Sequence, residues 1–143
     1  MKPTLWKIQP SPDLFSSSPH SSIHEHLGIT FDRAGEDFIE ATLPVDHRTR
    51  QPFGLLHGGA SVVLAESLGS MASYFVIGDP NKKCVGIEVN ASHLRSIKQG
   101  LARGRVTPIR LGSSLHVWDI VIWDNSDPQQ KPICKCRLTV MII

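Results

Sequence analysis

The residues best suited to chemistry lie in one short stretch of the chain. Residues 51–59 read Gln-Pro-Phe-Gly-Leu-Leu-His-Gly-Gly, and Glu66 follows seven residues later. The first N–H groups of a helix have no intrahelical partner and sit at the positive end of its dipole, and glycine lets other groups approach closely. Gly58 and Gly59 are therefore candidate donors to a carbonyl oxygen that becomes negatively charged during a reaction. The alternative interpretation is a tight entry turn into a helix with no chemical role.

Glu66 is the carboxylate of this stretch. A helix expected from Gly59 to about Phe75 places it on one stripe with Ser70 and Ser73. A solvent-facing helix of this length usually carries several charges, whereas this one carries a single charge in seventeen residues. We therefore expect both faces to be covered, and a covered carboxylate beside an opening is a candidate general base or nucleophile. An ordinary solvated face is the alternative, because periodicity fits both.

Three further residues are candidates for ligand binding. His57 adjoins the glycine pair, where it either orients a ligand or holds the loop by hydrogen bonds to the backbone. His93 and Arg95 lie two apart on a predicted strand and therefore point to the same side of it. Arg95 suits a ligand phosphate, although a solvent-facing arginine is the commoner arrangement.

Other chemistries have no support in the sequence. Residues 51–66 contain no metal-binding spacing, and the chain has no C-x-x-C, no G-x-S-x-G turn and no glycine-rich phosphate loop. We therefore expect no metal, no cofactor, and neither redox nor nucleotide-hydrolysing activity.

The elements that must position these residues are one long helix and a set of strands. Leu64, Leu68, Met71 and Phe75 recur with helical spacing and predict the helix that begins near Gly59. A short helix over residues 23–28 and strands over 29–34, 37–45, 84–95, 101–110, 115–124 and 133–143 are expected as well. Because short connections join the last four strands, they predict an antiparallel meander. One long helix against five or six antiparallel strands is an α+β architecture.

The composition is typical of one folded domain. The chain has 143 residues, of which 41% are hydrophobic and 20% charged, so it can bury a core, and disorder is excluded for most of its length. No apolar run approaches the roughly 20 residues of a membrane span, and a net charge of +2 is too small for a dedicated nucleic-acid binder. Residues 1–22, rich in Pro and Ser from residue 9, are expected to form a poorly ordered arm before a single domain over 23–143.

The cysteines indicate the cellular compartment. Cys84, Cys134 and Cys136 are odd in number and irregular in spacing, which argues against a disulfide framework. The start of the chain carries no charged-then-apolar export signal. Together these observations predict a cytoplasmic protein with reduced thiols.

Taken together, the motifs resemble those of the hotdog-fold acyl-CoA thioesterases. The resemblance rests on Ala41-Thr42-Leu43-Pro44-Val45-Asp46-His47, Gln51-Pro52-Phe53-Gly54, His57-Gly58-Gly59, and Glu66 with Ser70. It runs from about Leu27 to the C-terminus and points to the branch that contains the phenylacetate-pathway thioesterases and the bacterial 1,4-dihydroxy-2-naphthoyl-CoA hydrolases. In that family a curved antiparallel sheet wraps a central helix, which agrees with the order of elements above. The resemblance implies hydrolysis of an acyl-CoA or aroyl-CoA thioester.

The family pattern also implies residue roles. Glu66 matches the catalytic carboxylate, which acts as nucleophile or as general base on water. The backbone N–H of Gly58 or its neighbour matches the group that polarises the thioester carbonyl. The other matches are Gln51 and His57, which position the thioester, Ser70, which places the carboxylate or the water, and His93, near the acyl pocket. Gly59, Arg95 and Phe53 complete the set of candidate substrate-binding residues.

The spacing of the two central groups bears on how the site is assembled. Gly58 and Glu66 are eight residues apart, which is about 12 Å along a helix. A donor and a base that act on one carbonyl must each lie within about 3 Å of it. We therefore expect them to come from two subunits related by a two-fold axis, and the resemblance implies a dimer of dimers, a homotetramer. The expected partners are the thioester substrate and further copies of the chain, without nucleic acid or membrane.

Two alternative functions are compatible with the same fold. One is a hotdog-fold dehydratase or hydratase, which also uses a histidine and a carboxylate but usually places the pair differently. The other is a non-catalytic acyl-CoA-binding domain, against which the presence of Glu66 argues.

Overall fold

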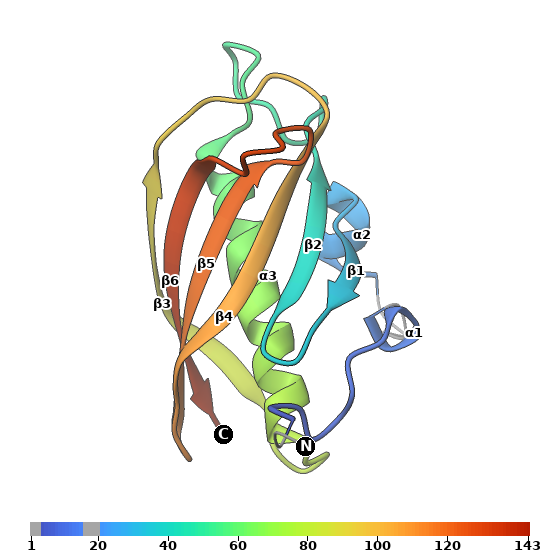
Figure 1. The fold of residues 1–143 in the computed structure, drawn as a ribbon, viewed down its shortest axis with the longest axis vertical. Helices are drawn as coiled ribbons and strands as arrows, with labels where there is room; N and C mark the ends of the chain where they lie inside the picture. Colours follow the sequence, from blue (N-terminus) through green and yellow to red (C-terminus); the bar gives the residue numbers. More distant parts are fainter. Residues whose placement is uncertain (1–3, 16–20) are drawn as a thin grey trace.

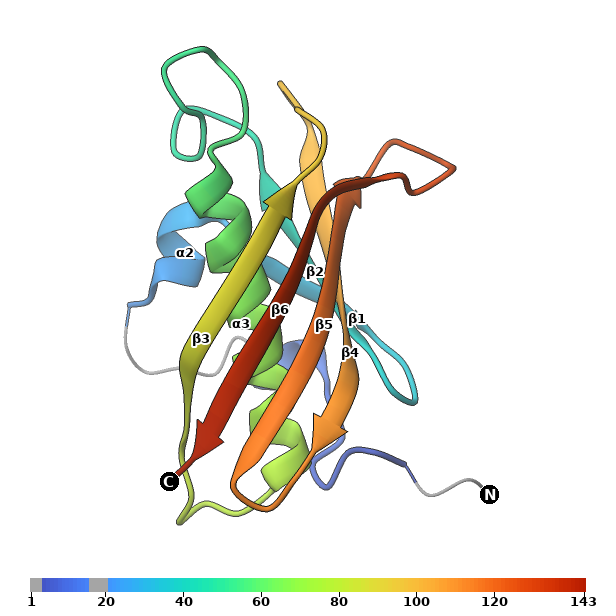
Figure 2. The same ribbon diagram turned by 90° about the vertical axis from the view of Figure 1, so that its left-hand side faces the viewer.

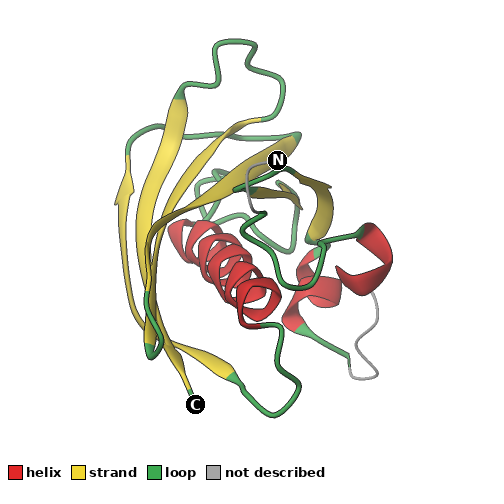
Figure 3. Cartoon of the chain, turned by 60° about the horizontal axis from the view of Figure 1, so that its bottom comes forward, coloured by secondary structure: helices red, strands yellow, loops and turns green. Residues whose placement is uncertain are grey.

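A six-stranded antiparallel sheet curves around one long helix in the computed structural model (Figure 1). The structure describes residues 4–15 and 21–143. Its elements are α1 (Pro12–Phe15), α2 (Ile23–Leu27), β1 (Thr30–Ala34), β2 (Ile39–Pro44), α3 (Gly58–Ile77), β3 (Cys84–His93), β4 (Leu101–Leu111), β5 (Leu115–Asp124) and β6 (Pro132–Ile142). Figure 3 shows the sheet on one side of α3 and the short helices α1 and α2 on the other. The α+β architecture and the hotdog fold expected from the sequence are confirmed.

The composition of α3 suits a helix that packs closely against a sheet. Leu64, Leu68 and Phe75 are fully buried, as their spacing predicts. Gly69 lets β6 approach closely, because a Cβ there would clash with a leucine side chain of that strand. The helix begins one residue earlier than predicted and ends two residues later, at Ile77. The next residue, Gly78, caps it in a left-handed conformation.

Among the described residues, α3 is the helix that is long and apolar enough to cross a membrane. Its mean hydropathy reaches 1.5 over an 18-residue window. The sequence expectation that no segment approaches a span is wrong for this helix, because glycine, alanine and serine separate its strongly apolar residues. However, 61% of the window is buried inside the fold. Packing against the sheet accounts for the apolar character of α3.

The strand order differs from the predicted meander. β4, β5 and β6 are neighbours, but β3 pairs with β6 at one edge of the sheet, and β4 pairs with β2 (Figure 2). The chain therefore crosses the end of the sheet between β3 and β4. Ile97 is buried in this crossing, and its carbonyl oxygen accepts a hydrogen bond of 2.9 Å from the N–H of Leu56. The short connection between β3 and β4 predicted that these two strands are neighbours. Instead, burial of Ile97 and the pairing of β4 with β2 and of β3 with β6 favour the crossing.

Glu40 of β2 is fully buried within a network of charges. Arg103 donates to its Oε2 at 3.1 Å, and Arg105 donates to its Oε1 at 2.7 Å. Asp32 accepts two further hydrogen bonds from Arg103. The alternation of polar and apolar residues along β2 does not predict this network, because the arginines lie 63 and 65 residues away from Glu40 in sequence.

Replacing Glu40 by Ala is expected to lower the free energy of unfolding by about 3 kcal/mol, because the change removes the buried counter-charge of two arginines. Urea denaturation at pH 7 measures the difference. Glu36→Ala, at an exposed position between β1 and β2, is the control and should change the free energy by less than about 0.5 kcal/mol. Equal unfolding free energies for the two variants would contradict the stabilising role of Glu40.

The N-terminal segment packs against the domain. Trp6 is 4% exposed, and its Nε1–H donates to a backbone carbonyl oxygen of the β1–β2 turn at 2.7 Å. Phe15 stacks on Phe31 of β1 with ring centroids 4.9 Å apart. Residues 4–15 thus differ from the poorly ordered arm expected over residues 1–22, because buried aromatic rings outweigh a composition rich in Pro and Ser. Residues 1–3 and 16–20 lie outside the described residues.

The three cysteines are free thiols. Cys134 and Cys136 point to the same side of β6, as predicted, and are buried with their Sγ atoms 3.5 Å apart. The contact with Cys134, together with burial, raises the pKa of Cys136. Both side chains therefore belong to the core.

Candidate active site

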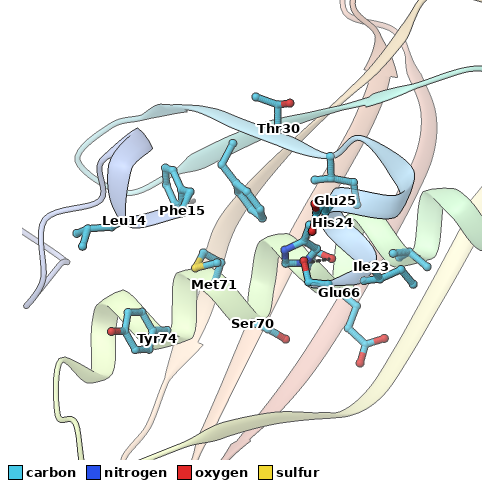
Figure 4. A pocket seen from close by; sticks show the side chains of 15 residues that line it. Leu14, Phe15, Ile23, His24, Glu25, Thr30, Glu66, Ser70, Met71 and Tyr74 are labelled. Atoms are coloured by element: carbon cyan, nitrogen blue, oxygen red, sulfur yellow. Dashed lines mark hydrogen bonds between the residues drawn. The ribbon is translucent and has the colours of Figure 1, made fainter. Parts of the chain in front are cut away.

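A larger and a smaller hollow, both lined by described residues, border α3. The larger has a volume of about 990 Å³ and lies between α3 and the layer formed by α1, α2 and β1 (Figure 4). Its α3 side chains are Val63, Glu66, Ser67, Ser70, Met71 and Tyr74. The smaller has a volume of about 380 Å³ and lies at the start of α3, beside the chain crossing between β3 and β4.

Glu66 lies half-buried in the larger hollow, near the middle of α3. Figure 4 shows the carboxylate of Glu66 and the hydroxyl of Ser70 pointing to the same side of the helix. Gly86 of β3 leaves room for the carboxylate, because a Cβ there would clash with Glu66 Oε1. Among the residues that the structure describes, the Glu66 carboxylate has no hydrogen bond or ion pair. It is therefore available to a water molecule or a substrate.

The start of α3 presents a single free backbone N–H. Gly59 donates its N–H to Nδ1 of His57 at 2.8 Å, so this donor is already used. Within the described part of the chain, the N–H of Gly58 has no acceptor, and Gly58 lines the smaller hollow. The expected donor role therefore remains open to the N–H of Gly58, while His57 engages the N–H of Gly59.

His57 caps the helix through this hydrogen bond, which is the second of the two roles considered for it. Because Nδ1 accepts, the proton of the neutral ring is assigned to Nε2. The side chain is exposed, and its ring does not line either hollow. Within this chain, His57 therefore holds the loop at the start of α3 by a hydrogen bond to the backbone.

The remaining predicted binding residues divide between the smaller hollow and the surface. Gln51, His93 and Arg95 line that hollow together with Gly58. A Cβ on Gly58 would lie only 2.8 Å from His93 Nε2, so the imidazole lies directly against this glycine. Arg95 donates to a backbone carbonyl oxygen at the start of β6 at 2.8 Å. Phe53 is 88% exposed and lines neither hollow, so the structure does not bring it to the site.

The predicted site residues therefore form two groups within one protomer. Glu66 and Ser70 belong to the larger hollow, and Gly58 and its neighbours belong to the smaller one. Glu66 and Gly58 lie on the same continuous helix, where eight residues separate them by about 12 Å. No single carbonyl group can contact both within one chain. The predicted residues are therefore divided between two separate hollows.

Ser73 continues the stripe of Glu66 and Ser70 but is fully buried. Its Oγ accepts a hydrogen bond of 2.8 Å from Trp118 Nε1 and lies 3.0 Å from His116 Nδ1. Burial lowers the pKa of His116, so the ring is neutral at pH 7. Ser73 therefore ties α3 to β5, whereas Glu66 and Ser70 line the larger hollow.

Sequence reasoning missed one polar pair in the larger hollow. His24 Nε2 of α2 and Ser67 Oγ of α3 form a hydrogen bond of 2.9 Å. Burial lowers the pKa of His24, so this ring is also neutral at pH 7. The prediction of a helix over residues 23–28 placed His24 correctly, but its partner lies 43 residues further along the chain. No local sequence pattern links the two.

The family described as the Thioesterase superfamily matches residues 53–130. Proofreading thioesterase EntH of Cronobacter sakazakii is 45% identical over 139 residues, which cover 97% of this chain and 98% of that protein. The 1,4-dihydroxy-2-naphthoyl-CoA hydrolase of Escherichia coli is 45% identical over 139 residues, with coverages of 97% and 99%. The crystal structure of thioesterase HI1161 from Haemophilus influenzae has a TM-score of 0.90 at 44% identity, covering 98% of this chain and 95% of that one. This chain therefore belongs to the thioesterase superfamily and is a thioester hydrolase.

Proposed function

We propose that the protein hydrolyses acyl-CoA or aroyl-CoA thioesters, with Glu66 and Gly58 as its central groups. The observation that supports this is the pair of half-sites on α3, an unpaired carboxylate midway along the helix and a free N–H at its start. Glu66 either removes a proton from the attacking water or attacks the carbonyl carbon itself. The N–H of Gly58 donates to the carbonyl oxygen as it gains negative charge. The carbon–sulfur bond then breaks and CoA leaves as its thiolate. When water is the nucleophile, the acyl group leaves directly as a carboxylic acid, which loses its proton. When Glu66 is the nucleophile, the acyl group remains on it as a mixed anhydride, and water then hydrolyses the anhydride to the free acid and the Glu66 carboxylate.

Neighbouring residues assist these steps. Ser70 lies one turn after Glu66 on the same side of α3, where its hydroxyl orients the carboxylate or the water. Gln51 and His93 flank Gly58 in the smaller hollow and hold the thioester against the N–H. His57 fixes the start of the helix, which keeps this N–H aimed at the substrate.

The complete site requires two subunits in this proposal. A two-fold axis that packs two α3 helices antiparallel brings Gly58 of one protomer toward Glu66 of the other. The larger hollow then receives the acyl group, while the smaller hollow of the partner receives the thioester. A dimer of dimers contains four such sites.

The identity of the acyl group is tested with a panel of thioesters. A relative acts, by its name, on 1,4-dihydroxy-2-naphthoyl-CoA, and a hollow of about 990 Å³ has room for an acyl group of that size. The panel contains medium-chain acyl-CoA, benzoyl-CoA and 1,4-dihydroxy-2-naphthoyl-CoA, and the release of free thiol is followed. Cleavage of the aroyl members supports the proposal, whereas absence of thiol release from every member contradicts it.

Replacing Gly58 by Pro is expected to lower kcat about 100-fold, because proline removes the one N–H that serves as oxyanion donor. Proline suits the first position of a helix, and the extended backbone of His57 (φ −67°, ψ 131°) is the conformation that a residue before proline prefers. The helix is therefore expected to persist. Steady-state kinetics with the best member of the panel measure the loss.

Gly58→Ala is the matched control for this variant. Alanine brings a Cβ against His93 as proline does, but it retains the N–H. We expect Gly58→Ala to keep at least ten times the kcat of Gly58→Pro. Equal losses in the two variants would assign the effect to displacement of His93 and contradict the donor role.

A further inference from the structure

The larger hollow contains one polar pair that the proposed reaction does not use. The α3 residues that line it form two rows, one with Glu66, Ser70 and Tyr74, and one with Val63, Ser67 and Met71. Ser67, in the second row, is bonded to His24 of α2 at 2.9 Å. Glu66 and Ser70 point away from this pair in Figure 4. The His24–Ser67 pair is therefore separate from the catalytic carboxylate but belongs to the same hollow.

The surroundings of the pair are largely apolar and aromatic. The ring of His24 meets the ring of Phe31 edge-on, with centroids 5.4 Å apart, and Phe31 stacks on Phe15. Val63 and Met71 flank Ser67 one turn before and one turn after it on α3. Flat faces and a flexible thioether suit the faces of an aromatic ring system. A hydrogen-bonded polar pair beside such apolar walls selects for a polar substituent at one place on an otherwise apolar ligand.

The hydrogen-bonding capacity of the pair is incompletely used. Among the described residues, Ser67 is the hydrogen-bonding partner of the His24 ring, through Nε2, and Nδ1 has no partner. Since no buried side-chain nitrogen or oxygen in the described chain lacks a partner, Nδ1 is open to solvent or ligand. A neutral imidazole and a serine hydroxyl share one hydrogen bond, which leaves one donor and two acceptor sites between them. A hydroxyl group, which both donates and accepts, matches this pair.

We propose that His24 and Ser67 bind a hydroxyl substituent on the aromatic ring of an aroyl-CoA substrate and so determine the specificity of the enzyme. The proposal rests on the proposed thioesterase function. The aroyl group lies in the larger hollow with its carbonyl carbon at Glu66 and its ring between α3 and the layer of α1, α2 and β1. In this layer, Phe15 of the N-terminal segment packs against the aroyl ring, and His24 of α2 makes the polar contact with its hydroxyl group.

The test compares benzoyl-CoA with its three monohydroxy isomers on the full-length enzyme. We expect the wild type to prefer at least one hydroxylated isomer, measured as a ratio of kcat/KM. His24→Phe keeps an aromatic ring against Phe31 but removes both nitrogens, and it should reduce this ratio about five- to tenfold, the usual effect of one lost hydrogen bond. The rate with benzoyl-CoA itself should change less than about twofold, since no hydroxyl is present to lose its partner. Ser67→Ala, a smaller change, should reduce the same ratio in the same direction.

His26→Phe is the control, because His26 lies exposed on the same short helix and does not line the hollow. Its ratio should equal that of the wild type. Equal rates of the wild type with benzoyl-CoA and all its hydroxylated isomers would overturn the inference while leaving the thioesterase function intact. Parallel losses with both kinds of substrate in His24→Phe and Ser67→Ala would assign the pair a structural role and overturn it as well. Absence of thiol release from every panel member by the wild type would instead contradict the proposed function, and with it this inference.

Discussion

Glu66→Gln is expected to lower kcat/KM for thioester hydrolysis about 1000-fold, the scale on which a general base or nucleophile contributes. The carboxamide occupies nearly the same volume over Gly86 as the carboxylate, so the hollow and the fold should be unchanged. However, it neither accepts a proton from water nor attacks a carbonyl carbon. Free-thiol release under steady-state conditions measures the loss.

Binding should survive the same substitution. The dissociation constant of a non-hydrolysable thioether analogue is expected to change less than about threefold, because the carboxylate contributes mainly in the transition state. Glu25→Gln is the matched control, since Glu25 is a second carboxylate lining the same hollow but lies on α2. Unaltered turnover in Glu66→Gln, or an equal loss in Glu25→Gln, would reject the assigned role.

Two inactive variants are expected to restore activity to each other when their subunits mix. A dimer formed from one Glu66→Gln chain and one Gly58→Pro chain contains one site with both substitutions and one site with neither. Random exchange at equal concentrations makes half of the dimers mixed, so about a quarter of the wild-type activity should return. The increase is large because each parent variant retains at most about one per cent of the activity.

The control mixture combines Glu66→Gln with the double variant Glu66→Gln, Gly58→Pro. No intact site can form in it, and its activity should stay at the parental level. The measurement follows thiol release after co-refolding or co-expression of the two chains. If the first mixture also stays inactive while the chains demonstrably associate, the two groups do not share a site across subunits.

Sequence alone predicted those parts of the protein that local spacing controls. Leu64, Leu68 and Phe75 recur at helical intervals, and their burial follows from that period wherever the sheet lies. Gly28 ends α2 in a left-handed conformation because it lacks a Cβ, which is a property of the residue itself. Spacing also showed that Gly58 and Glu66 are too far apart along one helix to share a carbonyl group, and the continuous α3 retains that separation.

Other features depend on contacts between residues distant in sequence. Strand order was predicted from short connections. In the structure, β2 occupies the edge of β4 that β3 was predicted to pair with, and β3 pairs with the free edge of β6 instead. The N-terminal segment was expected to be poorly ordered from its composition, yet Phe15 stacks on a phenylalanine of β1, and Trp6 donates a hydrogen bond to the β1–β2 turn. No local pattern contains information about such partners.

The same distinction divides the candidate site. Residue types and spacing predicted Glu66 and Gly58 as candidates, because a lone carboxylate and bare helix N–H groups are local properties. Tertiary structure decided which N–H is free, since the ring of His57 occupies that of Gly59. It also joined His24 to Ser67 across 43 residues of sequence. The sequence therefore determined which candidate groups the chain offers, and the packing of α1, α2 and β1 on α3 decided what surrounds them, because only the folded chain brings these surfaces into contact.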